Sequence, residues 1–85
     1  MTYLVASDYS STPAGHRFRA LVEAGNIVQI PGTHNGLAAL QAKRAGFQAV
    51  YLSGAAITAS MGLPDLGVIT MDEVCFFVRQ VSRAV

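Results

Sequence analysis

Three small residues in a row offer the chemistry of an anion-binding site. Ser53, Gly54 and Ala55 follow a short apolar run and supply one hydroxyl together with backbone N–H groups that no bulky side chain covers. Groups of this kind can hold a carboxylate or a phosphate. The same residue types also suit a tight turn between a strand and a helix, so both interpretations stay open.

Two further side chains could take part in chemistry. Asp65 is the only carboxylate from residue 24 to residue 71, and it lies in the turn-rich stretch 62–67. A lone acid in such a stretch either acts on a substrate or accepts backbone N–H groups within a turn. Tyr51 belongs to the apolar run 49–52, where its ring either faces a binding pocket or packs against neighbouring side chains.

Other residues with chemical potential carry weaker signals. His34 could act as an acid or base, although an isolated histidine in a polar loop is more often a capping or solvent-facing residue. Cys75 falls on the apolar stripe of an expected helix, which favours a small buried side chain. The sequence has no nucleotide-binding glycine motif, and no pair of His, Asp or Glu residues has convincing metal-ligand spacing. We therefore predict no metal-ligating residue in this sequence.

The composition argues against several classes of function. The chain has 85 residues, of which 52% are hydrophobic and 13% charged, and its formal net charge is +1. This balance argues against a nucleic-acid-binding surface, and the single cysteine rules out an intramolecular disulfide framework. No apolar run reaches the length of about 18 residues that spans a membrane. The first ten residues also lack the basic residues of a signal peptide, so we expect a soluble cytoplasmic protein without a membrane partner.

A helix that follows an N-terminal arm is the first expected element. Residues 1–11 mix polar residues with a short apolar triplet, and we interpret them as an arm without a core of its own. Thr12 is the expected helix cap, and Pro13 suits the first helical position because its missing N–H costs nothing there. Gly25 is expected to end this helix in the left-handed conformation.

Two apolar runs separated by a helix predict a parallel sheet. Residues 27–30 and residues 49–52 each follow a helix-ending glycine and lead into a glycine-containing loop. The helix expected between them covers residues 37–45. Such a repeat of αβ units favours parallel strands that are buried on both faces.

The remaining residues predict a loop and one more helix. Residues 55–60 are small and loop-like, and residues 62–67 are turn-rich. Thr70 and Glu73 form a capping box that opens a helix running to the last residue. The apolar stripe of this helix is wide, which suggests contact with more than one neighbouring element.

The predicted fold class is α/β, with an N-terminal helix and about two βα units over residues 12–85. A mean hydropathy of +0.40 is high for so short a chain. The last expected helix also stops where a third strand would begin. A complete eightfold barrel needs about 200–250 residues, so we expect residues 12–85 to be an incomplete part of a larger core.

Four motifs resemble the isocitrate lyase and phosphoenolpyruvate mutase superfamily, and within it the methylisocitrate lyases. They are Ile30–Gly36 (Ile-Pro-Gly-Thr-His-Asn-Gly), Arg44–Phe47, Tyr51–Ala56 and Gly62–Gly67 (Gly-Leu-Pro-Asp-Leu-Gly). The resemblance covers most of this chain but only the first quarter to third of a family member. It implies the N-terminal segment of a (β/α)8 TIM-type barrel, incomplete in this chain, in a homo-oligomer that is usually a tetramer with helices swapped between subunits.

The resemblance also implies an activity and a set of site residues. It implies Mg²⁺-dependent cleavage of a carbon–carbon bond, in which 2-methylisocitrate is split into pyruvate and succinate. By position, Ser53, Gly54 and Ala55 would bind the carboxylate end of this small-molecule substrate. Tyr51 would lie in the same pocket, and Asp65 would be the catalytic acid of the Leu-Pro-Asp loop. Ala55 stands where some members have a second glycine, a change that keeps the backbone N–H contact.

Two parts of the family's machinery are missing from the sequence. The aspartate-containing metal site and the Lys-x-Cys-Gly-His catalytic loop do not occur in these residues. The ligands of the implied Mg²⁺ are therefore not in this chain, and we expect the chain alone to be inactive. Two alternatives remain: another superfamily reaction on phosphonopyruvate or oxaloacetate, and a non-catalytic α/β module that binds a homologous partner.

Overall fold

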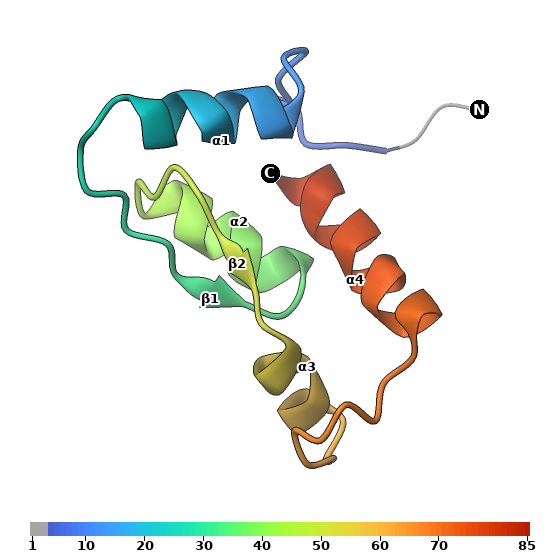
Figure 1. Ribbon diagram of the computed structural model, residues 1–85. Helices are drawn as coiled ribbons and strands as arrows, with labels where there is room; N and C mark the ends of the chain where they lie inside the picture. Colours follow the sequence, from blue (N-terminus) through green and yellow to red (C-terminus); the bar gives the residue numbers. More distant parts are fainter. Residues whose placement is uncertain (1–3) are drawn as a thin grey trace.

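Within residues 4–85 the chain forms four helices and a two-stranded parallel sheet. The computed structural model describes residues 4–85. In chain order the elements are α1 (Ala14–Glu23), β1 (Gly32–Thr33), α2 (Gly36–Arg44), β2 (Tyr51–Leu52), α3 (Gly54–Ser60) and α4 (Met71–Ala84). The strands pair in parallel, and α2 connects them (Figure 1). The predicted α/β class with parallel strands is confirmed.

The helix between the strands forms because both of its ends carry strong local signals. At its start, the Asn35 side-chain oxygen accepts a hydrogen bond from the backbone N–H of Ala38 at 2.8 Å. This bond satisfies one of the donors that the first helical turn leaves free. After its end, Gly46 adopts a φ of +100°, a conformation that glycine tolerates best. The helix predicted over 37–45 is therefore confirmed to within one residue at each end.

The strands lie later in the chain than the apolar runs suggest. The strand predicted at 27–30 is wrong: this stretch is irregular, and the Ile27 side chain is 96% exposed. Pairing begins where the carbonyl of Pro31 accepts a hydrogen bond from the N–H of Tyr51 at 2.9 Å. A strand is defined by its neighbour, and the run 27–30 has no neighbouring strand within residues 4–85. The strand predicted at 49–52 is confirmed only in its second half.

The prediction of a loop at 55–60 is wrong, because these residues belong to helix α3. The Ser53 hydroxyl oxygen caps this helix by accepting a hydrogen bond from the N–H of Ala56 at 3.1 Å. The hydroxyl of the buried Thr58 donates to the carbonyls of Gly54 and Ala55, at 3.1 and 3.0 Å. The small residues of this stretch therefore form a helix, because the Ser53 cap and the Thr58 hydroxyl both make hydrogen bonds to its first turn.

The two longest helices begin differently. The predicted cap at Thr12 is wrong: Pro13 takes the capping position of α1, without any side-chain cap bond. Gly25, which follows α1, has the predicted left-handed conformation with a φ of +79°. In α4 the predicted cap is confirmed, since the Thr70 oxygen accepts a hydrogen bond from the N–H of Glu73 at 3.2 Å.

Few side chains are buried. The buried hydrophobic residues are Ala39, Ala42, Ile57 and Val81. Helices α2 and α4 pack against each other, and a methyl group added at Gly36 would lie only 3.3 Å from the carbonyl oxygen of Gln80. The prediction of strands buried on both faces is wrong, because Tyr51 of β2 is 63% exposed. The predicted burial of Cys75 is also wrong, since its side chain is exposed on α4.

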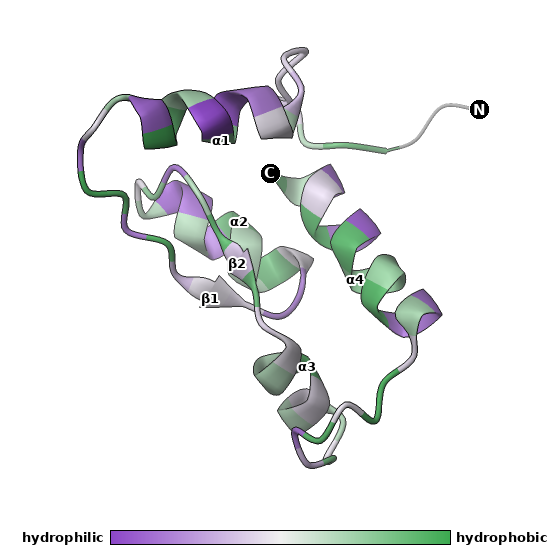
Figure 2. Cartoon of the chain, in the orientation of Figure 1, coloured by the Kyte–Doolittle hydropathy of each residue, from purple (hydrophilic) through white to green (hydrophobic). Residues whose placement is uncertain are grey.

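The chain exposes more surface than a compact protein of its mass. Its accessible surface is 6265 Å², whereas a compact 9.0 kDa monomer exposes about 4,900 Å². Its radius of gyration is 13.7 Å, against about 12 Å for a compact domain of this length. Hydrophobic residues lie on α4 and on the connection between α1 and β1 (Figure 2). These elements therefore do not close around a core of their own.

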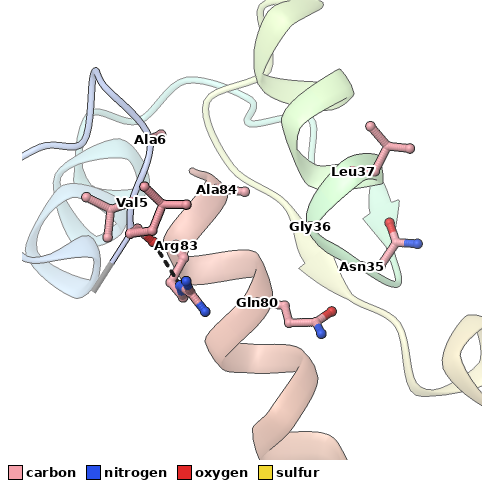
Figure 3. Close-up of a pocket in the computed structure, with 9 residues that line it drawn as sticks. Val5, Ala6, Asn35, Gly36, Leu37, Gln80, Arg83 and Ala84 are labelled. Carbon is pink, nitrogen blue, oxygen red and sulfur yellow. Dashed lines mark hydrogen bonds between the residues drawn. The ribbon is translucent and has the colours of Figure 1, made fainter. Parts of the chain in front are cut away.

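The N-terminal arm contacts both α4 and α2. The N–H of Ala6 donates to the carbonyl of Arg83 at 2.9 Å, and the Arg83 Nε donates to the carbonyl of Leu4 at 2.9 Å (Figure 3). The Asp8 carboxylate accepts a hydrogen bond from the Lys43 ammonium at 2.8 Å. Residues 1–3 of the predicted arm lie outside the described residues. None of the helices within residues 4–85 has the length and apolar character needed to span a bilayer.

The excess exposed surface leads to a first prediction. We expect the isolated 85-residue chain to bind 8-anilinonaphthalene-1-sulfonate with a strong rise in fluorescence, because hydrophobic side chains of α4 and of 27–30 remain uncovered. A fluorescence titration at neutral pH measures this binding. A sharp cooperative melt of a monomer without dye binding would contradict it.

The ion pair of the arm leads to a second prediction. The hydrogen bond from Lys43 holds the pKa of Asp8 below its ordinary value of 3.8. Because the folded pKa is lowered, the stabilising effect is complete above the unfolded pKa and disappears as the pH falls through the folded pKa. We expect the Lys43→Met variant to return the pKa of Asp8 towards 3.8 in a carboxyl NMR titration. An Arg79→Met variant should leave this pKa unchanged, because Lys43 and Arg44 are the cations that lower it.

Candidate functional site

The residues best placed to bind a ligand follow the carboxyl end of β2. In parallel α/β folds, ligands bind beyond the carboxyl ends of the strands. The register pairs Gly32 with Tyr51 and Thr33 with Leu52. Ser53, the next residue, therefore emerges directly at this end of the sheet.

The Ser53 hydroxyl accepts one hydrogen bond, and its own hydrogen can still be donated. Its oxygen accepts the hydrogen bond from Ala56 that caps α3. None of the hydrogen bonds found among residues 4–85 uses its hydrogen. A hydroxyl can donate one bond while accepting others, so Ser53 can donate to a carboxylate without losing its role as the cap.

Gly54, Ala55 and Tyr51 border the same end of β2. Gly54 and Ala55 form the first turn of α3, and both are exposed. Nothing lies within 4 Å of a methyl group added at Gly54, so the backbone there is open to approach. Tyr51 is largely exposed and therefore does not pack into a core. Four of the five predicted site residues thus lie within residues 51–55, in which Tyr51, Gly54 and Ala55 are exposed and Ser53 is half-buried.

Asp65, the fifth predicted residue, belongs to a different segment from the other four. It is exposed in the connection between α3 and α4, which leaves α3 at the end remote from β2 (Figure 1). The turn around it is closed by a 2.9 Å hydrogen bond from the N–H of Leu66 to the carbonyl of Pro64. None of the hydrogen bonds or ion pairs within the described part of the chain joins Asp65 to Ser53 or Tyr51.

Thr33 is a residue of this region that the sequence did not single out. It is 3% exposed, and its hydroxyl donates to the Tyr51 carbonyl at 3.3 Å. Its own carbonyl accepts a hydrogen bond from the N–H of Ser53 at 2.8 Å. The only signal in the sequence is a hydroxyl-bearing residue directly after Pro31-Gly32, which does not distinguish a buried contact from a loop residue.

His34 interacts with its neighbour rather than with the predicted site residues. Its Nε2 lies 3.3 Å from the Asn35 side-chain nitrogen, an arrangement in which the amide donates to the unprotonated ring nitrogen. Both side chains are partly buried at the start of α2. The structure therefore places His34 beside a helix cap.

The described residues do not form a metal site. No group of three or more His, Cys, Asp or Glu side chains comes together anywhere in residues 4–85. Magnesium is bound in proteins through carboxylates, waters and substrate oxygens at nearly octahedral geometry. Asp65 alone offers a carboxylate in this region, and one exposed carboxylate does not make such a cage.

Two surface hollows lie along the N-terminal arm and away from the predicted site. One, of about 530 Å³, is lined mainly by the arm, the start of α2 and the end of α4 (Figure 3). The other, of about 490 Å³, extends beside the Asp8–Lys43 pair. Tyr51, Ser53 and Asp65 line neither of these two hollows.

The comparisons with known proteins all point to one family of enzymes. The family model for phosphoenolpyruvate phosphomutase matches residues 18–85. The chain is 52% identical over 84 residues to a 2-methylisocitrate lyase of Bacillus subtilis. This match covers 99% of the chain but 28% of the relative. The chain therefore spans about a quarter of the length of the curated relatives that it matches.

Solved structures of similar proteins share the arrangement of the elements. The crystal structure of a phosphoenolpyruvate phosphomutase from Streptomyces platensis matches with a TM-score of 0.80 and 42% identity, over 87% of this chain and 25% of that chain. A phosphonopyruvate hydrolase, in complex with oxalate and Mg²⁺, matches with a TM-score of 0.82 and 27% identity. That match covers 87% of this chain and 26% of the hydrolase.

The cap of α3 leads to a third prediction. Ser53→Ala removes the acceptor for the Ala56 N–H, and we expect it to lower the free energy of unfolding by about 1 kcal/mol. Ser53→Thr keeps an acceptor and should lose less. Ser82→Ala, an exposed site in α4, is the matched control and should have little effect. Urea denaturation of the native protein that carries these residues gives the values; equal losses at Ser53 and Ser82 would contradict the prediction.

Proposed function

Because this chain belongs to the phosphoenolpyruvate phosphomutase family, we propose that the protein carrying it is a carbon–carbon lyase. The proposed reaction splits 2-methylisocitrate into pyruvate and succinate. The observation that carries the proposal is the accessible stretch after β2, where Ser53 keeps a hydrogen free to donate to a carboxylate. The 52% identity to an enzyme named for this substrate supports the reaction class.

We propose that residues 12–85 form the first βα units of an eightfold barrel, preceded by the arm 1–11. The parallel pairing of β1 with β2 through α2 supports this proposal, as do the TM-scores of 0.80 and 0.82. In such a barrel the uncovered faces of α4 and of the sheet would contact further elements. We further propose that the enzyme is a cytoplasmic homo-oligomer, with a tetramer as the expected assembly.

The proposed roles of the site residues follow from their positions. Ser53, Gly54 and Ala55 bind a carboxylate of the substrate through the Ser53 hydroxyl and backbone N–H groups. Tyr51 forms a wall of the same pocket, because its ring is exposed beside them. Asp65, in the connection between α3 and α4, acts as the catalytic acid.

Mg²⁺ is the proposed cofactor of the whole enzyme. The support comes from the phosphonopyruvate hydrolase, whose structure is a complex with oxalate and Mg²⁺. The described residues of this chain do not fit a metal cage by themselves. We therefore propose that the ligands of the metal come from other residues of the enzyme, and that this chain supplies the part of the pocket that holds the substrate.

A reaction on phosphonopyruvate or a related oxo acid is the second candidate. The matches to a phosphoenolpyruvate phosphomutase and to a phosphonopyruvate hydrolase favour it. Both candidates need a carboxylate held at the end of β2, so the geometry of this chain supports them equally. The identity to the lyase, 52% against 42% and 27% for these two proteins, makes the lyase reaction our first choice.

The fourth prediction tests the activity. We expect the native protein that carries these residues to release pyruvate from 2-methylisocitrate in the presence of Mg²⁺, and to lose this activity when the metal is chelated. A coupled assay for pyruvate measures the rate, with phosphonopyruvate and oxaloacetate as competing substrates. The isolated 85-residue chain should be inactive, because it brings together no metal site within residues 4–85. Preference of the native protein for phosphonopyruvate would replace the lyase proposal with the second candidate.

A further inference from the structure

We propose that Thr33 is a positioning residue for the substrate-binding stretch Tyr51–Ala55. The inference rests on the proposed function, because it assigns Thr33 the task of holding that stretch for substrate. Thr33 itself does not contact the substrate in this proposal. It acts through Tyr51 and Ser53, the residues on either side of Leu52.

Thr33 holds both of these residues with different atoms. Its side-chain hydroxyl donates to the carbonyl of Tyr51 at 3.3 Å, and its backbone carbonyl accepts from the N–H of Ser53 at 2.8 Å. Its side chain is almost completely buried. A buried hydroxyl is retained at little cost only when it has a partner, and the Tyr51 carbonyl is that partner.

The shortness of the sheet makes these bonds important. β1 and β2 each have only two residues, so few backbone bonds define which residues face each other. A slip of one residue along a strand moves every side chain to the opposite face. In the observed register the Thr33 hydroxyl reaches the Tyr51 carbonyl, so it adds a side-chain bond to the few backbone bonds that hold this register.

The register in turn decides where the Ser53 hydroxyl lies. Ser53 has an extended conformation, with φ −84° and ψ 113°, and its oxygen caps α3. The bond from its N–H to Thr33 is the last one between the strands before α3 begins. A shift at this point would move the hydroxyl hydrogen that we assign to the substrate carboxylate. We therefore expect the side chain of Thr33 to affect substrate binding indirectly, through the positions of Tyr51 and Ser53.

The test compares Thr33→Val with Thr33→Ser in the native protein that carries these residues. Valine keeps the shape of threonine but cannot donate a hydrogen bond, whereas serine keeps the hydroxyl and loses a methyl group. Thr70→Val is the matched control, because it removes a hydroxyl that caps α4 and whose hydrogen bonds go to Glu73 rather than to β2. Each variant is measured for KM and kcat with 2-methylisocitrate and Mg²⁺. Hydrogen exchange of the Ser53 amide is measured in parallel.

We expect Thr33→Val to raise KM about 3- to 10-fold, the loss that corresponds to one neutral hydrogen bond. The Ser53 amide should exchange faster by a similar factor, while the amide of Ala38 in α2 is unchanged. Thr33→Ser should keep KM within about 2-fold of the wild-type value. Thr70→Val should lower stability without raising KM.

Two results would overturn the proposal. One is a Thr33→Val variant that loses stability as Thr70→Val does but keeps the wild-type KM, which is the behaviour of a merely structural threonine. The other is unchanged exchange of the Ser53 amide in Thr33→Val. If the native protein acts on none of 2-methylisocitrate, phosphonopyruvate and oxaloacetate, the proposed function fails and the assignment to substrate binding fails with it. In that case the exchange measurement alone shows whether Thr33 holds the register.

Discussion

The pairing of two very short parallel strands is the interaction on which the rest of the chain depends. It pairs Gly32 with Tyr51 and Thr33 with Leu52. Parallel strands cannot be joined by a tight turn, so their pairing requires a helix between them, and α2 fills this role. The same pairing brings the ends of both strands to one edge, where α3 begins. Without it, the small residues after Leu52 would have no fixed position relative to the first strand.

These elements leave a large hydrophobic surface uncovered. Most large hydrophobic side chains of the helices and connections remain exposed. Within residues 4–85 the buried apolar residues are Ala39, Ala42, Ile57 and Val81. A chain with so few buried groups gains little hydrophobic stabilisation. The high mean hydropathy and the exposed α4 therefore have a common cause: these residues have the composition of a protein interior, but within residues 4–85 few neighbours cover them.

Local signals predicted the helices better than the strands and better than the site. Thr70 caps its helix as expected, because a cap is formed by residues three positions apart and needs no distant partner. The run 27–30 failed as a strand for the opposite reason, since its pairing depends on a neighbour that the run itself does not encode. Ser53 was chosen for its hydroxyl, yet its role as the cap of α3 was missed because residues 55–60 look like a loop.

The sequence alone determined the α/β class, the ends of α2, the start of α4 and the stretch of small residues from Ser53 onward. These features depend on residues close together in the chain. Only the tertiary structure decided the register of the strands and the burial of Thr33. The physical reason is that each of these depends on contacts between segments distant in the chain. Such contacts follow from how the elements pack, and no local pattern of residue types specifies them.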